Sequence, residues 1–283
     1  SKLAAGLFLL SAVSQVEATT RTWLCASSAA WTDSANWSGG AVPATNEDVV
    51  IDGNGAYAPL LNLAGGATNI NSLAIGATLA STLTISNGDS AVKYLTVYAD
   101  CTIGPTGTLT HAANSTLETH KLSVSVGGNL TVNAGGRIDA TSRGYNGGQG
   151  PGAAGQYNGA GHGGEAYRNI LGPTYGSIVA PTNLGSGGGS SAAWTGGGAI
   201  RLAVQGATTN NGAIAVDGTG GSGDGGGGAG GSVYLVTGAL AGNGVISANG
   251  GNRTGATAGG GGGGRIAVLV TNGTEFGTDS ITA

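Results

Sequence analysis

Carboxylates and histidines are the residues best suited to catalysis or metal binding in this chain, and they are few and scattered. The 283 residues include 14 Asp and Glu and 3 His. A lyase built on stacked strands would need several Asp on adjacent strands to hold calcium, with an Arg or Lys nearby as base. Asp217 and Asp224 lie in one repeat, and Asp139 could stack near Asp217 if residues 141–198 loop out. We interpret all three as turn residues beside Gly, so calcium has only weak support.

Other catalytic signatures are missing from the sequence. His111, His120 and His162 show no metal-ligand spacing, and the chain has no G-x-S-x-G, HExxH or P-loop motif. We therefore predict no catalytic, metal or cofactor site and no enzyme activity. A polysaccharide lyase or hydrolase is the least favoured function.

Aromatic side chains gather in residues 141–198, the longest interruption of the repeat described below. They could stack on sugars, as in an adhesin that binds surface glycans, or they could pack against the flank of the fold or another subunit. The candidate residues for such contacts are Tyr157, Tyr167, Tyr175 and Trp194.

Composition narrows the elements that could position these side chains. Sixty residues are Gly, charged residues make up 8%, and the net charge is −4. A nucleic-acid partner would need clustered Lys and Arg, so none is expected. Gly disfavours helices, and the apolar residues alternate instead of recurring every 3.6 residues. With 40% hydrophobic residues, the chain can bury a core, so we predict an all-β fold.

An internal repeat is the clearest signal in the sequence. Strand patterns beginning at Gly197, Gly230 and Gly263 are spaced by 33 residues, and a second strand sits between successive copies. Equal units that stack can bury a continuous apolar column. The predicted core of the repeat consists of Ile138, Ile200, Leu202, Ile214, Val233, Leu235, Ile246, Ile266 and Val268.

The repeat period favours a right-handed parallel β-helix, or β-solenoid. Eight Asn-Gly pairs could form its corners, because both residues tolerate positive φ. The same pairs also suit antiparallel hairpins, which remain the alternative. The Gly-rich links at 219–231 and 251–264 could be flexible, or could lie side by side as extended polyglycine-II-like chains that hydrogen-bond one another.

Two segments carry a resemblance to known proteins. Residues 31–43 (WTDSANWSGGAVP), 48–52 (DVVID) and 73–79 resemble the N-terminal module of bacterial secreted β-solenoid proteins of the adhesin or autotransporter-passenger type. Residues 175–189 and the repeats through Val270 are similar to Gly-rich regions of large bacterial surface proteins. The resemblance implies a right-handed parallel β-helix at the cell surface with a structural or adhesive role.

The N-terminus predicts export. Residues 1–18 have the charged, apolar and small-residue regions of a secretory signal; they are either cleaved or retained as a segment that docks on a neighbouring subunit. The apolar run is too short for a transmembrane segment. Cys25 and Cys101 could form one disulfide or remain buried thiols. If the host glycosylates Asn, the acceptor sequons are those of Asn36, Asn114, Asn129, Asn252 and Asn272.

One continuous domain is expected over residues 19–283. It would comprise an N-terminal cap (19–69) with Trp23, Trp31 and Trp37 over the first strands, β-solenoid units (70–140), the Gly- and Tyr-rich insertion (141–198) and the 33-residue repeats (199–283). The favoured function is a secreted structural protein that assembles with copies of itself, through its ends or its Gly-rich faces, into a filament, sheath or surface layer.

Overall fold

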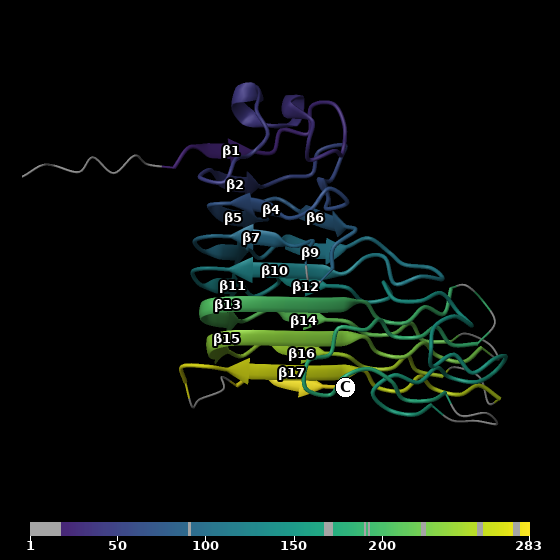
Figure 1. Cartoon of the computed structure of the whole chain (residues 1–283). Coiled ribbons are helices and arrows are strands. Elements are labelled where there is room, and N and C mark those ends of the chain that lie inside the picture. Colours follow the sequence, from purple (N-terminus) through teal and green to yellow (C-terminus); the bar gives the residue numbers. More distant parts are fainter. Residues whose placement is uncertain are drawn as a thin grey trace, which may run out of the picture.

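Figure 1 shows the computed structural model, in which strands lie one above another along a single axis. The structure describes residues 18–89, 92–166, 172–189, 191, 193–221, 225–253, 257–273 and 278–283. Regular structure in these ranges is almost all β, and every ladder between the named strands is parallel. The all-β parallel fold is confirmed, and the antiparallel alternative is wrong.

The described strands form two sheets. The larger sheet contains β1 (Thr20–Thr22), β2 (Asp48–Ile51), β4 (Thr68–Ile70), β5 (Ser72–Ile75), β7 (Leu95–Val97), β8 (Cys101–Ile103), β10 (Leu122–Val126), β11 (Leu130–Val132), β13 (Ala199–Asn210), β15 (Ser232–Gly242) and β17 (Arg265–Val270). The smaller sheet contains β3 (Leu60–Asn62), β6 (Ser81–Ser86), β9 (Gly107–His111), β12 (Arg137–Asp139), β14 (Ala213–Ala215), β16 (Val245–Ser247) and β18 (Ser280–Thr282).

Alternation along each strand creates the core. In β6, for example, Leu83 and Ile85 are fully buried, whereas Thr82 and Thr84 between them are half-buried on the outer face. Stacking such strands in register aligns the aliphatic side chains in columns and removes them from water. The sheets thus enclose one hydrophobic core that runs from Trp23 to Ala248.

The 33-residue repeat corresponds to neighbouring strands. Ile200 of β13 pairs with Val233 of β15, and Val233 pairs with Ile266 of β17. On the smaller sheet, Ile138, Ile214 and Ile246 follow one another in the same way. The pairing of β13 with β15 has a register shift between Val204 and Ala207, where β13 also changes partner from β10 to β11.

Residues 141–198 leave the stack and return to it without disturbing the register. Leu122 of β10 pairs directly with Ile200 of β13, on the far side of the insertion, and Ile138 of β12 pairs with Ile214 of β14. The excluded segment packs with the Gly-rich links, which extend together to one side of the strands (Figure 1).

The Gly-rich links are joined by backbone hydrogen bonds. Successive N–H groups in one link donate to three different segments: Gly227 to Gly259, Gly228 to Thr219, and Ala229 to Ser186. Gly230, three residues after Gly227, donates to Gly262 in the same segment as Gly259. Gly231, three residues after Gly228, donates to Val216 in the same segment as Thr219. The partners of each N–H therefore recur with a period of three residues.

The Asn-Gly pairs are not the left-handed corners that the sequence predicted. Among them only Gly55 and Asn87 have positive φ within the described residues. Several of the glycines in these pairs instead allow the backbones of neighbouring segments to lie close together. A Cβ at Gly212 would lie 2.2 Å from the carbonyl oxygen of Gly136, and one at Gly244 would lie 2.5 Å from that of Gly212. Glycine is required there because strands stack without room for a side chain.

The N-terminal end is closed by aromatic side chains. Trp23, Trp31 and Trp37 are buried, and Trp37 packs edge-on against both others, with ring centroids 5.0 and 4.7 Å apart. Two short 3-10 turns, η1 (Ser34–Asn36) and η2 (Ser38–Gly40), shape this part of the chain. The Trp31 N–H donates to the carbonyl of Leu60, so the cap occupies the edge of β3.

Candidate functional site

The C-terminal end of the stack differs from the capped N-terminal end. Within the described residues, β17 pairs only with β15 and β18 pairs only with β16, so each leaves one backbone edge unpaired. Ile266 and Val268 are only partly buried there, although their counterparts Val233 and Leu235 in the preceding repeat are fully buried. Among the described residues, no further layer covers Ile266 and Val268.

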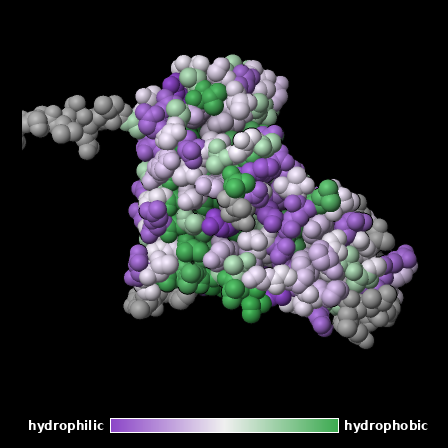
Figure 2. All heavy atoms as spheres, viewed as in Figure 1, coloured by the Kyte–Doolittle hydropathy of each residue, from purple (hydrophilic) through white to green (hydrophobic). Residues whose placement is uncertain are grey.

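Exposed apolar residues continue across this end. Ile281 of β18 is 47% exposed, although its counterpart Ile246 in β16 is fully buried, and Leu269 of β17 is 52% exposed. Val245, in the next strand β16, is also exposed. Figure 2 shows hydrophobic residues gathered at the lower end of the molecule, where Figure 1 places β17 and β18. We call β17, β18 and these side chains the open end. An unpaired apolar edge of this kind can accept a further strand.

The insertion aromatics occupy different environments. The Tyr175 hydroxyl donates to the carbonyl of Leu184 and lies 2.8 Å from Ser186 Oγ, and burial raises its pKa. The half-buried Trp194 ring lies against Gly225 and Gly189, where a Cβ would meet it at 2.0 and 2.3 Å. Tyr157 is 40% exposed.

Tyr167 lies outside the described residues. Trp194 packs against a Gly-rich link and Tyr175 bonds within the insertion, so packing against the flank of the fold remains open for both.

Two of the three histidines lie in the interior. His111 accepts a hydrogen bond from the N–H of Ala199 at Nε2, and its Nδ1 lies 2.8 Å from the carbonyl oxygen of Ala112. His162 Nδ1 lies 2.8 Å from the carbonyl oxygen of Gly230, and its ring stacks on Tyr175. Burial lowers the pKa of each ring to about 4. Both are therefore neutral structural groups that join the insertion or the core to the repeats.

The carboxylates are engaged by neighbouring donors. Asp217 accepts from Ser247 Oγ and the N–H of Asn249, while Asp139 pairs with Arg137. Burial opposes ionisation of Asp139, but hydrogen bonds from Thr141 and Arg137 outweigh it and lower its pKa. Asp139 pairs across the ladder with Ala215, two residues before Asp217. Asp224 lies outside the described residues, among which no cluster of three metal-ligating side chains occurs.

The two cysteines are free thiols, so the disulfide that the sequence allowed is not formed. Cys101 is buried in the core as part of β8, and burial raises its pKa to about 12. Cys25 is partly exposed in the cap, where its sulfur lies 2.9 Å from the N–H of Tyr57. Each thiol is held by a different part of the fold.

Two of the five sequons are in unsuitable positions. Asn36 is fully buried and donates to the carbonyl of Ala30, and Asn114 donates to the carbonyls of His120 and Arg143. Attaching a glycan to either would remove these bonds, so the prediction fails for both. Asn129, Asn252 and Asn272 are exposed.

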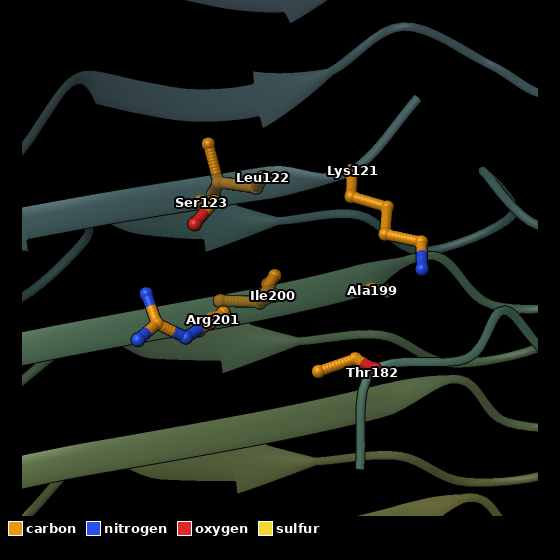
Figure 3. Close-up of a pocket in the computed structure, with 7 residues that line it drawn as sticks. All are labelled: Lys121, Leu122, Ser123, Thr182, Ala199, Ile200 and Arg201. Carbon is orange, nitrogen blue, oxygen red and sulfur yellow. The ribbon is translucent and has the colours of Figure 1, made fainter. Parts of the chain in front are cut away.

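A small cavity lies between β10 and β13 (Figure 3). Its lining includes Lys121, Ser123, Thr182 and Arg201, and its volume is about 10 Å³. That volume is at the lower limit for one water molecule. The buried Ser123 hydroxyl has no protein partner in the described chain, so a single water would satisfy it. A substrate has no room there.

Comparisons with protein-family models, curated proteins and solved structures find no match to this chain. The described residues also include no helix with the length and hydropathy needed to cross a membrane.

Proposed function

We propose that this chain is an extracellular, non-enzymatic structural subunit that assembles with copies of itself through the open end. The observation that carries the proposal is the contrast between the two ends of the stack. Tryptophans cover the first strands, whereas β17 and β18 present apolar side chains and unpaired backbone. Burying the open end against another copy would remove both from water.

The fold behind this proposal is a right-handed parallel β-helix. Parallel strands that follow one another in each sheet are joined through strands of the other sheet, as successive turns of a solenoid would be. Crossover connections between parallel strands of one sheet are right-handed in nearly all proteins. A solenoid of this kind grows by adding equal turns, so a second molecule can continue the stack where the first one ends.

The Gly-rich links fit a polyglycine-II-like bundle. An extended helix with three residues per turn directs successive N–H groups in three directions, 120° apart. The hydrogen bonds of Gly227, Gly228 and Ala229 to three segments, and their recurrence three residues later, are those expected of such helices. The bundle would give the subunit a second rigid face beside the β-helix.

Low charge favours contact between copies. The net charge of −4 is spread over 283 residues, so identical subunits repel one another weakly. Contact between two different ends is heterologous and generates an open fibre when the rotation between copies does not close. An open fibre of this kind would form a filament, sheath or surface layer, the structural role that the resemblance to bacterial surface proteins implies.

Charged substitutions at the open end test the proposal. Leu269→Lys and Ile281→Lys place charges on side chains that are already exposed, so the subunit should still fold. We expect the full chain to form ordered assemblies by negative-stain microscopy and sedimentation, and both variants to remain monomeric. Leu117→Lys, at a residue 70% exposed elsewhere, is the control and should assemble normally.

Either of two results would contradict this function. One is a full chain that stays monomeric at high concentration. The other is assembly of the Leu269→Lys and Ile281→Lys variants to the same extent as the Leu117→Lys control.

Residues 1–18, if retained, are our candidate for the strand that covers the open end of a neighbour. Residues 1–17 lie outside the described part of the chain, but their sequence is apolar, as a strand added to the core beside Ile266 and Val268 must be. A chain beginning at Thr19 should then fold but fail to assemble. Normal assembly of that chain would refute only the role of residues 1–18. The role of the open end would still be tested by the lysine variants.

A further inference from the structure

A polar groove runs along the outer face of the smaller sheet. It has a volume of about 380 Å³ and is lined by Thr82, Thr108, Thr110, Asp139, Thr141 and Arg143. Its size is within the range of small-molecule sites, but such sites are mostly apolar. A lining of hydroxyl and charged groups instead suits a ligand that is itself rich in hydroxyls.

Sequence periodicity places these hydroxyls in a regular array. Thr82 of β6 pairs with Thr108 of β9, and Thr84 pairs with Thr110, so the two Thr-Leu-Thr segments lie directly one above the other. The leucine between each pair of threonines is buried, which leaves Thr82, Thr84 and Thr108 half-buried on the outer face, whereas Thr110 is itself buried and bonded to Asp139. Neighbouring strands are about 4.8 Å apart. The threonines of adjacent strands thus recur at that interval on a rigid backbone.

Hydrogen-bonding capacity remains free in this groove. The Thr110 hydroxyl donates to the carbonyl of Asp139. For the hydroxyls of Thr82 and Thr108, the described chain supplies no hydrogen-bond partner. Free hydroxyls held by strands can bind a ligand without the entropy loss that ordering a loop would require.

Among the charged residues that line the groove, Arg143 is the one whose positive charge is available to bind a ligand. Arg137 and Asp139 neutralise each other as an ion pair, and the nearby Asp217 is held by Ser247 and the N–H of Asn249. The guanidinium of Arg143 has no ion-pair partner among the described residues. Arginine binds carboxylate and sulfate groups through paired, charge-assisted hydrogen bonds.

We infer that this groove binds an acidic polysaccharide. Arg143 binds a carboxylate or sulfate group of the polymer, and the threonine hydroxyls bind the hydroxyls of adjacent sugars. The site is distinct from the aromatic residues of 141–198 and from the open end, so the inference is independent of self-assembly. In an assembly, one groove per subunit would add avidity for a long polymer.

The test measures binding of the full chain to polygalacturonate, dextran sulfate and neutral dextran at low and moderate salt. We expect binding to at least one acidic polymer and none to dextran; the preferred acidic polymer tells whether carboxylate or sulfate is recognised. Arg143→Ala should weaken binding about tenfold, as loss of a charge-assisted hydrogen bond predicts. Thr82→Val and Thr108→Val should weaken it several-fold while conserving shape.

Arg253→Ala is the matched control, because it removes one exposed positive charge on the Gly-rich side of the molecule. Its affinity should equal that of the unmodified chain. Equal weakening of binding by Arg143→Ala and Arg253→Ala would overturn the site in favour of non-specific charge attraction. Binding of the unmodified chain to the acidic polymers that is no stronger than its binding to dextran would also overturn it. Repeating the titration with the Ile281→Lys variant separates groove binding from assembly, since a monomeric subunit should still bind short acidic oligosaccharides.

Discussion

At the residue scale, the glycines are needed mainly for space. In the links, most added Cβ atoms would meet a carbonyl oxygen of another residue at about 2 Å; for Gly230, for example, the distance to the oxygen of Ala248 is 1.8 Å. Ordinary Cβ contacts are far longer, so the backbones could not stay in place. The high Gly content thus allows segments to pack with hydrogen bonds but without side chains between them.

Neighbouring glycines provide a direct test of this role. A Cβ at Gly261 would lie 2.0 Å from the oxygen of Gly228, whereas one at Gly260 would find its nearest atom at 3.7 Å. Gly261→Ala should lower the free energy of unfolding by about 1–3 kcal/mol because of overpacking. Gly260→Ala should leave stability unchanged or raise it by up to about 1 kcal/mol. Equal midpoints of denaturation for the two variants would contradict a spatial role for Gly261.

The buried histidines predict loss of stability in acid. The pKa of His111 and His162 is about 4 in the folded chain, against an ordinary value of 6.5. Between pH 6.5 and 4 the unfolded chain therefore binds more protons, and stability falls as the pH falls. Above pH 6.5 this contribution is complete. Each ring adds a slope of about 1.4 kcal/mol per pH unit within the window.

Denaturation of the wild-type chain and of a His111→Gln, His162→Gln double variant between pH 7 and 4 measures this effect. The double variant should be less stable at pH 7, because the bonds to Ala112, Ala199 and Gly230 are disturbed, but its stability should depend less on pH. Parallel stability curves for the two proteins across the window would assign the acid sensitivity to other groups.

At the scale of elements, the two ends of the stack differ in whether the edge strand is covered: the cap covers the first strands, and the last strands are uncovered in the described residues. Arg21 of β1 pairs with Glu47 at 2.6 Å, and this bond lowers the pKa of the Glu47 carboxyl. The cap thus holds β1 and the turn before β2 together while the tryptophans fill the space above β2 and β3. No comparable layer lies beyond β17 in the described residues.

Removing the central ring of the cap should be costly. Trp37 is 1% exposed, and its indole N–H donates to the carbonyl of Trp31 at 2.7 Å. Trp37→Ala should destabilise the chain by about 3–5 kcal/mol, measured by calorimetry. Leu24→Ala, at a residue 55% exposed in the same region, should change stability by less than about 0.5 kcal/mol. Similar losses for both would show that the cap does not contribute to the core.

At the scale of the whole molecule, stability should vary along the stack. Strands in the middle are covered on both sides, whereas β17 and β18 are each covered on one. Local opening is easiest where few buried contacts must break. Hydrogen exchange of the monomer should therefore be slow in β9 to β13 and fastest in β17 and β18. Upon assembly, protection should rise at those two strands. Uniform exchange along the monomer would argue against an open end.

Much of this architecture was predictable because strands that stack produce a regular repeat of apolar residues in the sequence. A residue such as Ile200, Val233 or Ile266 recurs at the interval that brings the chain back to the same column, so the period reports the pairing. The tryptophans near the start indicated a closed end. The interpretation of Asn-Gly as left-handed corners failed, since Gly212 and Gly244 are required by close stacking, which local propensity does not reveal.

The polar groove and the buried sequons could not be anticipated in the same way. Thr82 and Thr108 are typical outward residues of strands, and only their stacking beside Arg143 makes a groove. Asn36 resembles an acceptor for glycans until the structure places it in the cap, where its side-chain oxygen accepts from the N–H of Ser27. Such roles depend on residues far apart in the chain.

Alternating aliphatic residues and a constant repeat length determine, by themselves, that this chain is all-β and that its strands recur in equal units with one buried face, because burial is repeated in every unit. The tertiary structure alone decides where residues 141–198 lie and which segments the Gly-rich links bind. These features arise from contacts between backbones, and backbone atoms are the same in every residue and leave no pattern in the order of side chains.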